Sequence, residues 1–183
     1  MTLCVGLVED GRCIMGADSC AIDDRDQRWQ LAEPKCWVMG GMVWADAGPS
    51  KPAQVLRRDG WCPKWGEGDP RAWVEQTLTP AIRKRLWGVY VEDEQKEHEI
   101  LIGVAGQFAV IYPETWEAIW VAEPPAIGNS DAVAAARGVL HATSQRWCDG
   151  IHGLDGEAKI TLALEAGSLV SPYVSGPWSF VRG

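Results

Sequence analysis

The order of strand-like and helix-like segments predicts an α+β fold with two antiparallel sheets, arranged as a four-layer αββα sandwich. Three observations support this. The first strand-like segments form hairpins, the helix-like segments come in runs, and a short strand-like segment closes the chain. Hairpins with grouped helices are typical of layered α+β domains and argue against a parallel βαβ fold. With 183 residues, 46% of them hydrophobic, the chain can bury one core, so we expect a single domain over residues 1–183.

Two hairpins are predicted near the N-terminus. Residues Leu3 to Val8 alternate, reach a Glu-Asp-Gly turn and return through Cys13 to Gly16. A polar loop over 23–28 separates this hairpin from the next. Two adjacent glycines then divide residues 35–39 from residues 42–45, which indicates a second hairpin.

The later segments continue the layered pattern. We expect a first helix with its cap and first turn in 48–52 that continues over 53–58, and further helices at 71–86, 128–144 and 157–169. Strands are expected at 100–104, 108–112, 116–121 and 178–181. Pro80 is expected to break or kink the second helix, because proline removes a backbone donor. Residues 59–70 are turn formers and are predicted as a loop, and the charged residues 92–99 as a solvated connector.

Composition excludes several classes of function. A formal net charge of −8 and the lack of a basic face disfavour nucleic-acid binding. No apolar run approaches the roughly 20 residues of a membrane span, and the start of the chain does not resemble a signal peptide, so we expect a cytoplasmic protein without a membrane partner.

The cysteines do not suggest a metal site. The six are scattered, form no C-x-x-C pair and do not cluster with the three histidines, so we expect no metal and no cofactor. Cys4, Cys13 and Cys36 lie in apolar runs and are predicted to be small buried hydrophobes.

Tryptophan is unusually frequent, with eleven in the chain. Four of these lie in strand-like segments and are predicted to fill a core between sheet and helices: Trp37, Trp44, Trp116 and Trp120. Trp61 and Trp65 fall in the Gly/Pro-rich loop and are candidates for a subunit contact.

Thr2 is the candidate nucleophile. A threonine hydroxyl is weak until a base takes its proton, and removal of Met1 would give Thr2 a free α-amine that titrates near pH 8 and can serve as that base. Asp18 follows the first hairpin and Lys35 begins the second, so both are expected near Thr2. The lysine would lower the pKa values of the hydroxyl and amine, and the aspartate would orient it. The alternative is a surface salt bridge of little consequence.

The segments Thr2-Leu3-Cys4-Val5-Gly6 and Gly16-Ala17-Asp18-Ser19 resemble the opening of proteasome β subunits and of HslV, N-terminal-nucleophile hydrolases. Asp18 follows Thr2 at the family spacing, and Lys35 matches the family lysine after a slightly longer loop. The resemblance returns at 126–137 and near the C-terminus, whereas 59–98 shows none.

The resemblance implies further site residues. The amides of Ala47 and Gly48 would stabilise an oxyanion, and Asn129 or Ser130 would take the place of a family serine. Asp46 is an unexpected acid there and would weaken oxyanion stabilisation if its carboxylate pointed inward. The later Asp-x-x-Ser pair of proteasomes has no clear counterpart, and the two candidates for its acid are Asp149 and Asp155.

Three functions are therefore weighed. The first is a threonine peptidase that cleaves peptides or proteins through an acyl-enzyme, in a homo-oligomeric ring that an AAA+ unfoldase could feed. The second is a non-catalytic structural or assembly subunit of the same fold. The third keeps the chemistry but acts on a small-molecule amide. The ring and the unfoldase follow from the resemblance alone.

Overall fold

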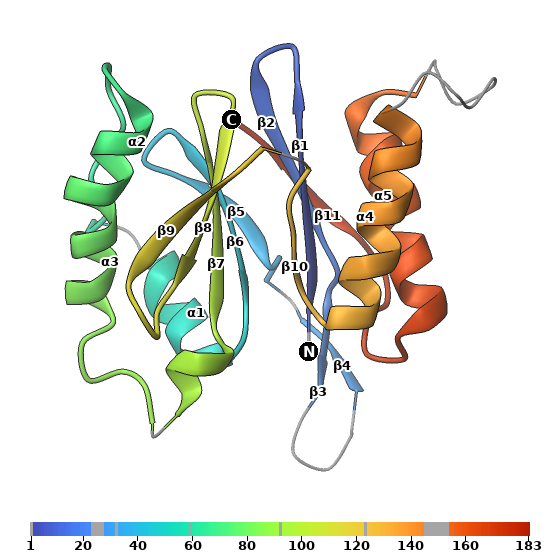
Figure 1. Ribbon diagram of the computed structural model, residues 1–183. Coiled ribbons are helices and arrows are strands. Elements are labelled where there is room, and N and C mark those ends of the chain that lie inside the picture. Colours follow the sequence, from blue (N-terminus) through green and yellow to red (C-terminus); the bar gives the residue numbers. More distant parts are fainter. Residues whose placement is uncertain are drawn as a thin grey trace.

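The computed structural model describes residues 2–22, 28–31, 33–58, 60–91, 93–122, 124–144 and 154–183. Two antiparallel sheets lie face to face between two layers of helices (Figure 1). The first sheet has the order β10 (Ala126–Gly128), β1 (Leu3–Glu9), β2 (Arg12–Ala17) and β11 (Ser179–Arg182). The second has the order β5 (Cys36–Met39), β6 (Met42–Ala47), β7 (Glu99–Val104), β8 (Gln107–Tyr112) and β9 (Glu117–Val121). The predicted αββα sandwich is confirmed.

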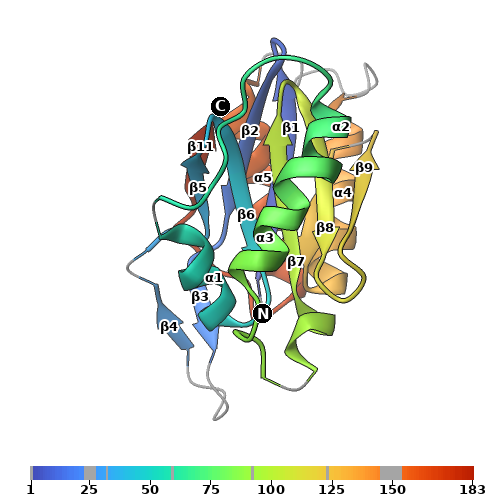
Figure 2. The same ribbon diagram turned by 90° about the vertical axis from the view of Figure 1, so that its left-hand side faces the viewer.

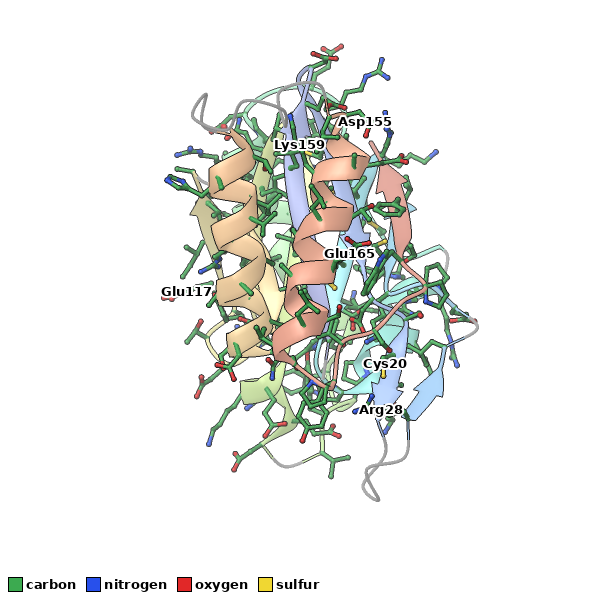
Figure 3. The ribbon with its side chains drawn as sticks, turned by 90° about the vertical axis from the view of Figure 1, so that its right-hand side faces the viewer. Cys20, Arg28, Glu117, Asp155, Lys159 and Glu165 are labelled. Atoms are coloured by element: carbon green, nitrogen blue, oxygen red, sulfur yellow. The ribbon has the colours of Figure 1, made fainter. Side chains whose placement is uncertain are left out.

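Helices cover the outer face of each sheet. The five-stranded sheet carries α1 (Ser50–Arg57) and a continuous stretch made of α2 (Pro70–Trp73), η1 (Val74–Leu78) and α3 (Thr79–Arg85) (Figure 2). The four-stranded sheet carries α4 (Ser130–Ser144) and α5 (Gly156–Val170) (Figure 3). A short 3-10 helix, η2 (Glu94–Glu97), precedes β7, and a two-stranded sheet of β3 (Cys20–Ile22) and β4 (Arg28–Gln30) lies at the end of the molecule where the chain begins.

The core has three parts that correspond to the interfaces between layers. Between the sheets lie alternate residues of β1, β2 and β6, among them Cys4, Met15 and Ala45. The opposite face of β6 presents Met42 and Trp44 to the helices above it. Leu3 and Val5 face α4 and α5. Because successive side chains of a strand point to opposite faces, β1 and β6 each contribute to two of these clusters.

The structure corrects several predicted elements. Of the loop predicted at 23–28, Arg28 belongs to strand β4, and residues 23–27 lie outside the described ranges; β3 and β4 on either side were not predicted. Residues 126–128 pair with β1, so β10 was missed as a strand. The strand β9 begins one residue later than predicted, because Trp116 has a positive φ of 59° and ends the preceding turn.

Pro80 does not break the helical stretch, which continues through it to Arg85. The five residues before Thr79 form a π-helix, in which the Thr79 amide bonds to the Val74 carbonyl, and Pro80 then falls in the first turn of α3. A proline in that position loses no helical hydrogen bond, and the wider π turn accommodates its ring.

The tryptophans fill the layer between the five-stranded sheet and its helices. Trp44 is fully buried, while Trp37, Trp116 and Trp120 are partly buried against the same cluster. Trp61 and Trp65 pack there as well: the Trp61 ring lies edge-on to Trp44 at 5.9 Å. Their position in the loop is therefore explained by packing within the chain.

Candidate active site

The structure brings Asp18 and Lys35 together beside the start of β1. The Lys35 ammonium lies 3.1 and 3.0 Å from the two carboxylate oxygens of Asp18, and it also donates to the carbonyl of Cys20. Asp18 is fully buried and Lys35 is 5% exposed. This pair is therefore a buried ion pair, and the surface salt bridge that was the alternative is excluded.

The Asp18 carboxylate also accepts hydrogen bonds from two backbone amides. Its Oδ1 accepts a 2.8 Å hydrogen bond from the amide of Leu3, and its Oδ2 accepts one of 3.0 Å from Cys20. Burial raises the pKa of the Asp18 carboxyl above its usual value, while Lys35 and the two amides lower it and offset part of that rise. The carboxylate thus ties the peptide that follows Thr2 to the Lys35 ammonium.

Thr2 lies where β1 begins, and β10 holds it from the other side. The side chain environment is nearly closed, with 7% of the residue exposed. Its carbonyl accepts a 2.9 Å hydrogen bond from the amide of Asn129. Gly128 opposes Leu3 in the ladder and has a φ of +117°, a region that glycine favours, so strands β1 and β10 can approach closely. The Gly128 amide in turn donates to Glu99 at 2.9 Å.

Ala47 and Gly48 border the same space from β6. Asp46, which precedes them, belongs to the opposite face of the strand: Ala45 and Ala47 face the region between the sheets, whereas the Asp46 carboxylate binds Arg57 of α1 at 3.1 Å. Asp46 and Arg57 also line the cleft, so the expected weakening of an oxyanion site is offset by the Arg57 guanidinium, toward which strand alternation turns the acid.

The candidates near the start of α4 differ in their roles. The side chain of Asn129 accepts a 3.1 Å hydrogen bond from the amide of Ala132, so it caps the helix, whereas Ser130 is exposed. Asp155 caps the start of α5 through the Ala158 amide at 2.8 Å, and it lies at the opposite end of the molecule from Cys20 (Figure 3). Asp155 is therefore not a site residue, and Asp149 lies outside the described residues.

A cleft of about 1360 Å³ joins these parts. Six of the predicted residues line it: Thr2, Lys35, Ala47, Gly48, Asn129 and Ser130. Asp18 does not line it and lies behind Lys35. Sequence reasoning missed Glu99, which lines the cleft as a half-buried carboxylate whose pKa is raised by burial. Its sequence signal was weak, since it ends a run of charged residues that was expected to be solvated.

The described part of the chain contains no group of three His, Cys, Asp or Glu side chains placed to hold a metal ion. None of its helices is both long and apolar enough to cross a membrane. Cys4, Cys13 and Cys36 are buried free thiols, as predicted.

No family model and no curated protein matches the sequence, but solved structures match its fold. The BPH protein of Thiobacillus denitrificans, solved in complex with epoxomicin, has a TM-score of 0.75 at 17% identity over 100% of this chain and 98% of that one. HslV from Trypanosoma brucei has a TM-score of 0.64 at 14% identity over 100% and 98%. The chain has the proteasome-like fold.

Anbu proteins share this proteasome-like fold. Anbu from Yersinia bercovieri, described as an ancestral beta-subunit, has a TM-score of 0.71 at 14% identity, and the match covers 98% of this chain and 80% of the Anbu chain. The Anbu complex of Pseudomonas aeruginosa, described as a helical assembly, has a TM-score of 0.68 at 14% identity over 99% and 80%. At these identities the likeness establishes the fold, and the chemistry has to be argued from the residues of this chain.

Proposed function

We propose that this protein is a threonine peptidase of the proteasome-like type, with Thr2 as nucleophile after removal of Met1. The observation that carries the proposal is the buried Asp18–Lys35 pair. Oδ1 of Asp18 accepts hydrogen bonds both from Lys35 and from the amide of Leu3, the residue that follows Thr2. Burial of a lysine costs free energy unless the charge is paired, and here Lys35 lines the same cleft as Thr2.

The proposed reaction passes through an acyl-enzyme. The α-amine of Thr2 takes the proton of the hydroxyl as Oγ attacks the carbonyl carbon, and the amides of Ala47 and Gly48 bind the oxyanion. Collapse breaks the C–N bond, and the ammonium of Thr2 returns its proton to the leaving amine. Water then attacks the ester, which releases the carboxylic acid and restores Thr2. Lys35 favours the deprotonated forms of the amine and hydroxyl, and Asp18 orients Lys35.

Peptides or unfolded proteins are the proposed substrates, in a homo-oligomer of single-domain subunits. The size of the cleft suits an extended peptide better than one small amide. Large apolar side chains such as Trp87 (78% exposed) and Leu169 (86% exposed) offer contact area for self-association. A cytoplasmic location and an AAA+ unfoldase partner complete the proposal and rest on the family resemblance.

The test combines intact mass and covalent labelling. Protein from its native host should lack the mass of Met1 and should take up one epoxyketone, mapped to Thr2. Thr2→Ser should keep the adduct because it keeps the hydroxyl, and Thr2→Ala should lose it. Lys35→Met, which retains the length of the stem, should label much more slowly while remaining folded.

The alternative is a non-catalytic assembly subunit, and the specific observation in its favour is the start of α4. There the Asn129 side chain caps the helix through the Ala132 amide and Ser130 is exposed, which differs from the serine that the family resemblance places at the active site. Retention of Met1 with no adduct would establish the assembly subunit and refute the peptidase. A labelled protein that cleaves small amides but no peptides would favour the third candidate.

A further inference from the structure

His98 is a buried polar side chain that the proposed reaction does not use. It lies between η2 and β7 and is 1% exposed. A histidine in such a place needs partners for both ring nitrogens, because an unpaired buried polar atom is costly. The partners that it has, and the one that is just out of reach, suggest its role.

One ring nitrogen is held firmly. The Tyr90 hydroxyl lies 2.7 Å from His98 Nδ1. The other nitrogen, Nε2, faces Oδ2 of Asp46 at 3.7 Å and has no hydrogen-bond partner among the described residues. A lone pair on Nε2 would oppose the carboxylate, so the favoured arrangement has the ring proton on Nε2 and the Tyr90 hydroxyl donating to Nδ1. A small movement would complete an Nε2–H to Asp46 hydrogen bond.

The Asp46 carboxylate extends this chain of contacts to α1. Its Oδ1 accepts from Arg57 at 3.1 Å, and the Arg57 guanidinium lies over the Trp37 ring at 4.9 Å. Glu33 is a second, more distant anion, 3.8 Å from Arg57. Tyr90, His98, Asp46 and Arg57 therefore form a polar row along the outer face of the strand that ends in Ala47.

His98 also touches the proposed oxyanion donor. Gly48 has a φ of +144°, and a Cβ there would lie 2.9 Å from the Cα and 3.0 Å from the Cδ2 of His98. The ring and backbone of His98 thus pack closely against Gly48. The Asp46 carboxylate, two residues before Gly48, faces the same ring at 3.7 Å, so His98 lies next to two residues of this turn.

We propose that His98 is a positioning residue that holds the Gly48 peptide in the orientation required for oxyanion binding. The inference rests on the proposed function for its catalytic meaning. Tyr90 fixes the ring, the ring packs against Gly48, and Nε2 faces the carboxylate of Asp46 two residues earlier. An error of about 1 Å in such a group costs roughly a hundredfold in rate, so the row is expected to affect kcat more than KM.

The activity experiment compares three variants of the full chain with one control. Tyr90→Phe removes only the hydroxyl, His98→Ala removes the ring, and His98→Gln retains an N–H that can reach Asp46. Tyr173→Phe is the matched control, because Tyr173 does not line the cleft. On a peptide-amide substrate, kcat should fall roughly tenfold to a hundredfold in His98→Ala and less in Tyr90→Phe, with KM within about threefold. His98→Gln should recover part of the loss.

A second readout is independent of activity. The backbone amide of Gly48 should exchange faster and shift its ¹⁵N resonance in Tyr90→Phe and His98→Ala, and should stay unchanged in Tyr173→Phe. Tyr90→Phe keeps this test informative if His98→Ala does not fold. An unchanged Gly48 amide in Tyr90→Phe, or a folded variant pair whose kcat stays within twofold of the parent, would overturn the inference. A parent protein that is neither labelled nor active would refute the peptidase, while the exchange data would still decide the positioning.

Discussion

The most informative single substitution is Gly128→Ala, because Gly128 lies against the carbonyl of Thr2 where β10 pairs with β1. A Cβ at this position would lie 1.8 Å from the carbonyl oxygen of Thr2, whereas Cβ contacts in proteins do not fall below 3.0 Å. The two strands would therefore have to separate by at least about 1.2 Å, the difference between these values. The φ of +117° adds strain, since only glycine adopts it readily.

The cost follows from these contacts. Backbone strain contributes about 1–3 kcal/mol. Two hydrogen bonds at the turn, from Asn129 to Thr2 and from Gly128 to Glu99, contribute about 1 kcal/mol each if they break. We therefore expect Gly128→Ala to lower the free energy of unfolding by about 3–5 kcal/mol. The displaced Thr2 should also react with an epoxyketone roughly a hundredfold more slowly in molecules that remain folded.

Gly138→Ala is the matched control. Gly138 lies within α4, and a Cβ there would meet nothing within 4 Å. Alanine is the better helix former, so this variant should gain about 0.4–1 kcal/mol of stability. Urea unfolding of both variants gives the comparison directly. If Gly128→Ala were as stable as Gly138→Ala, the close approach of β10 to Thr2 would be refuted.

Three further predictions concern ionisable groups. Lys35→Met should lower the free energy of unfolding at neutral pH by about 3–5 kcal/mol, because it strands the buried Asp18 carboxylate, and Asp18→Asn/Lys35→Met should recover much of this in urea unfolding. Burial raises the pKa of Glu99 in the folded state, so the unfolded chain releases this proton at a lower pH than the folded protein does. Ionisation of Glu99 therefore lowers the stability of the fold as pH rises from the unfolded pKa through the folded pKa. Glu99→Gln should raise the Tm at pH 8 and have less effect near pH 4. Burial raises the pKa of Cys62 to about 11, so native-state alkylation of Cys62, followed by mass spectrometry, should be slow at pH 8 and accelerate up to about tenfold per pH unit toward pH 10.

Each of these has a result that would count against it. A Lys35→Met variant as stable as the parent would mean that the Asp18–Lys35 pair contributes no net energy. An equal Tm change for Glu99→Gln at both pH values would show that this carboxylate titrates normally. Rapid labelling of Cys62 at pH 8, before any unfolding, would show that the thiol is not shielded. Cys13, whose pKa burial also raises to about 11, serves as an internal reference.

The position of Asp18 could be predicted from the sequence because it depends on one hairpin. A tight turn after Glu9 sets the register Cys4 to Ala17, and the next pair along the ladder brings Asp18 to Leu3. Alternation likewise predicts which residues of β6 share a face, although both faces are buried. These features are local: they follow from turn length and from the period of two, so a linear sequence is sufficient to derive them.

The sequence alone predicted the layered fold class, the hairpins and the position of Asp18 and Lys35 near Thr2. Only the tertiary structure decided that β10 pairs with β1, that Asp46 turns toward Arg57, and that Glu99 and His98 reach the site. Alternation tells on which side of a strand a residue lies, but it does not tell which distant segment faces it. Those partners, some more than a hundred positions apart, are chosen by the packing of whole layers, whose energy is summed over many contacts.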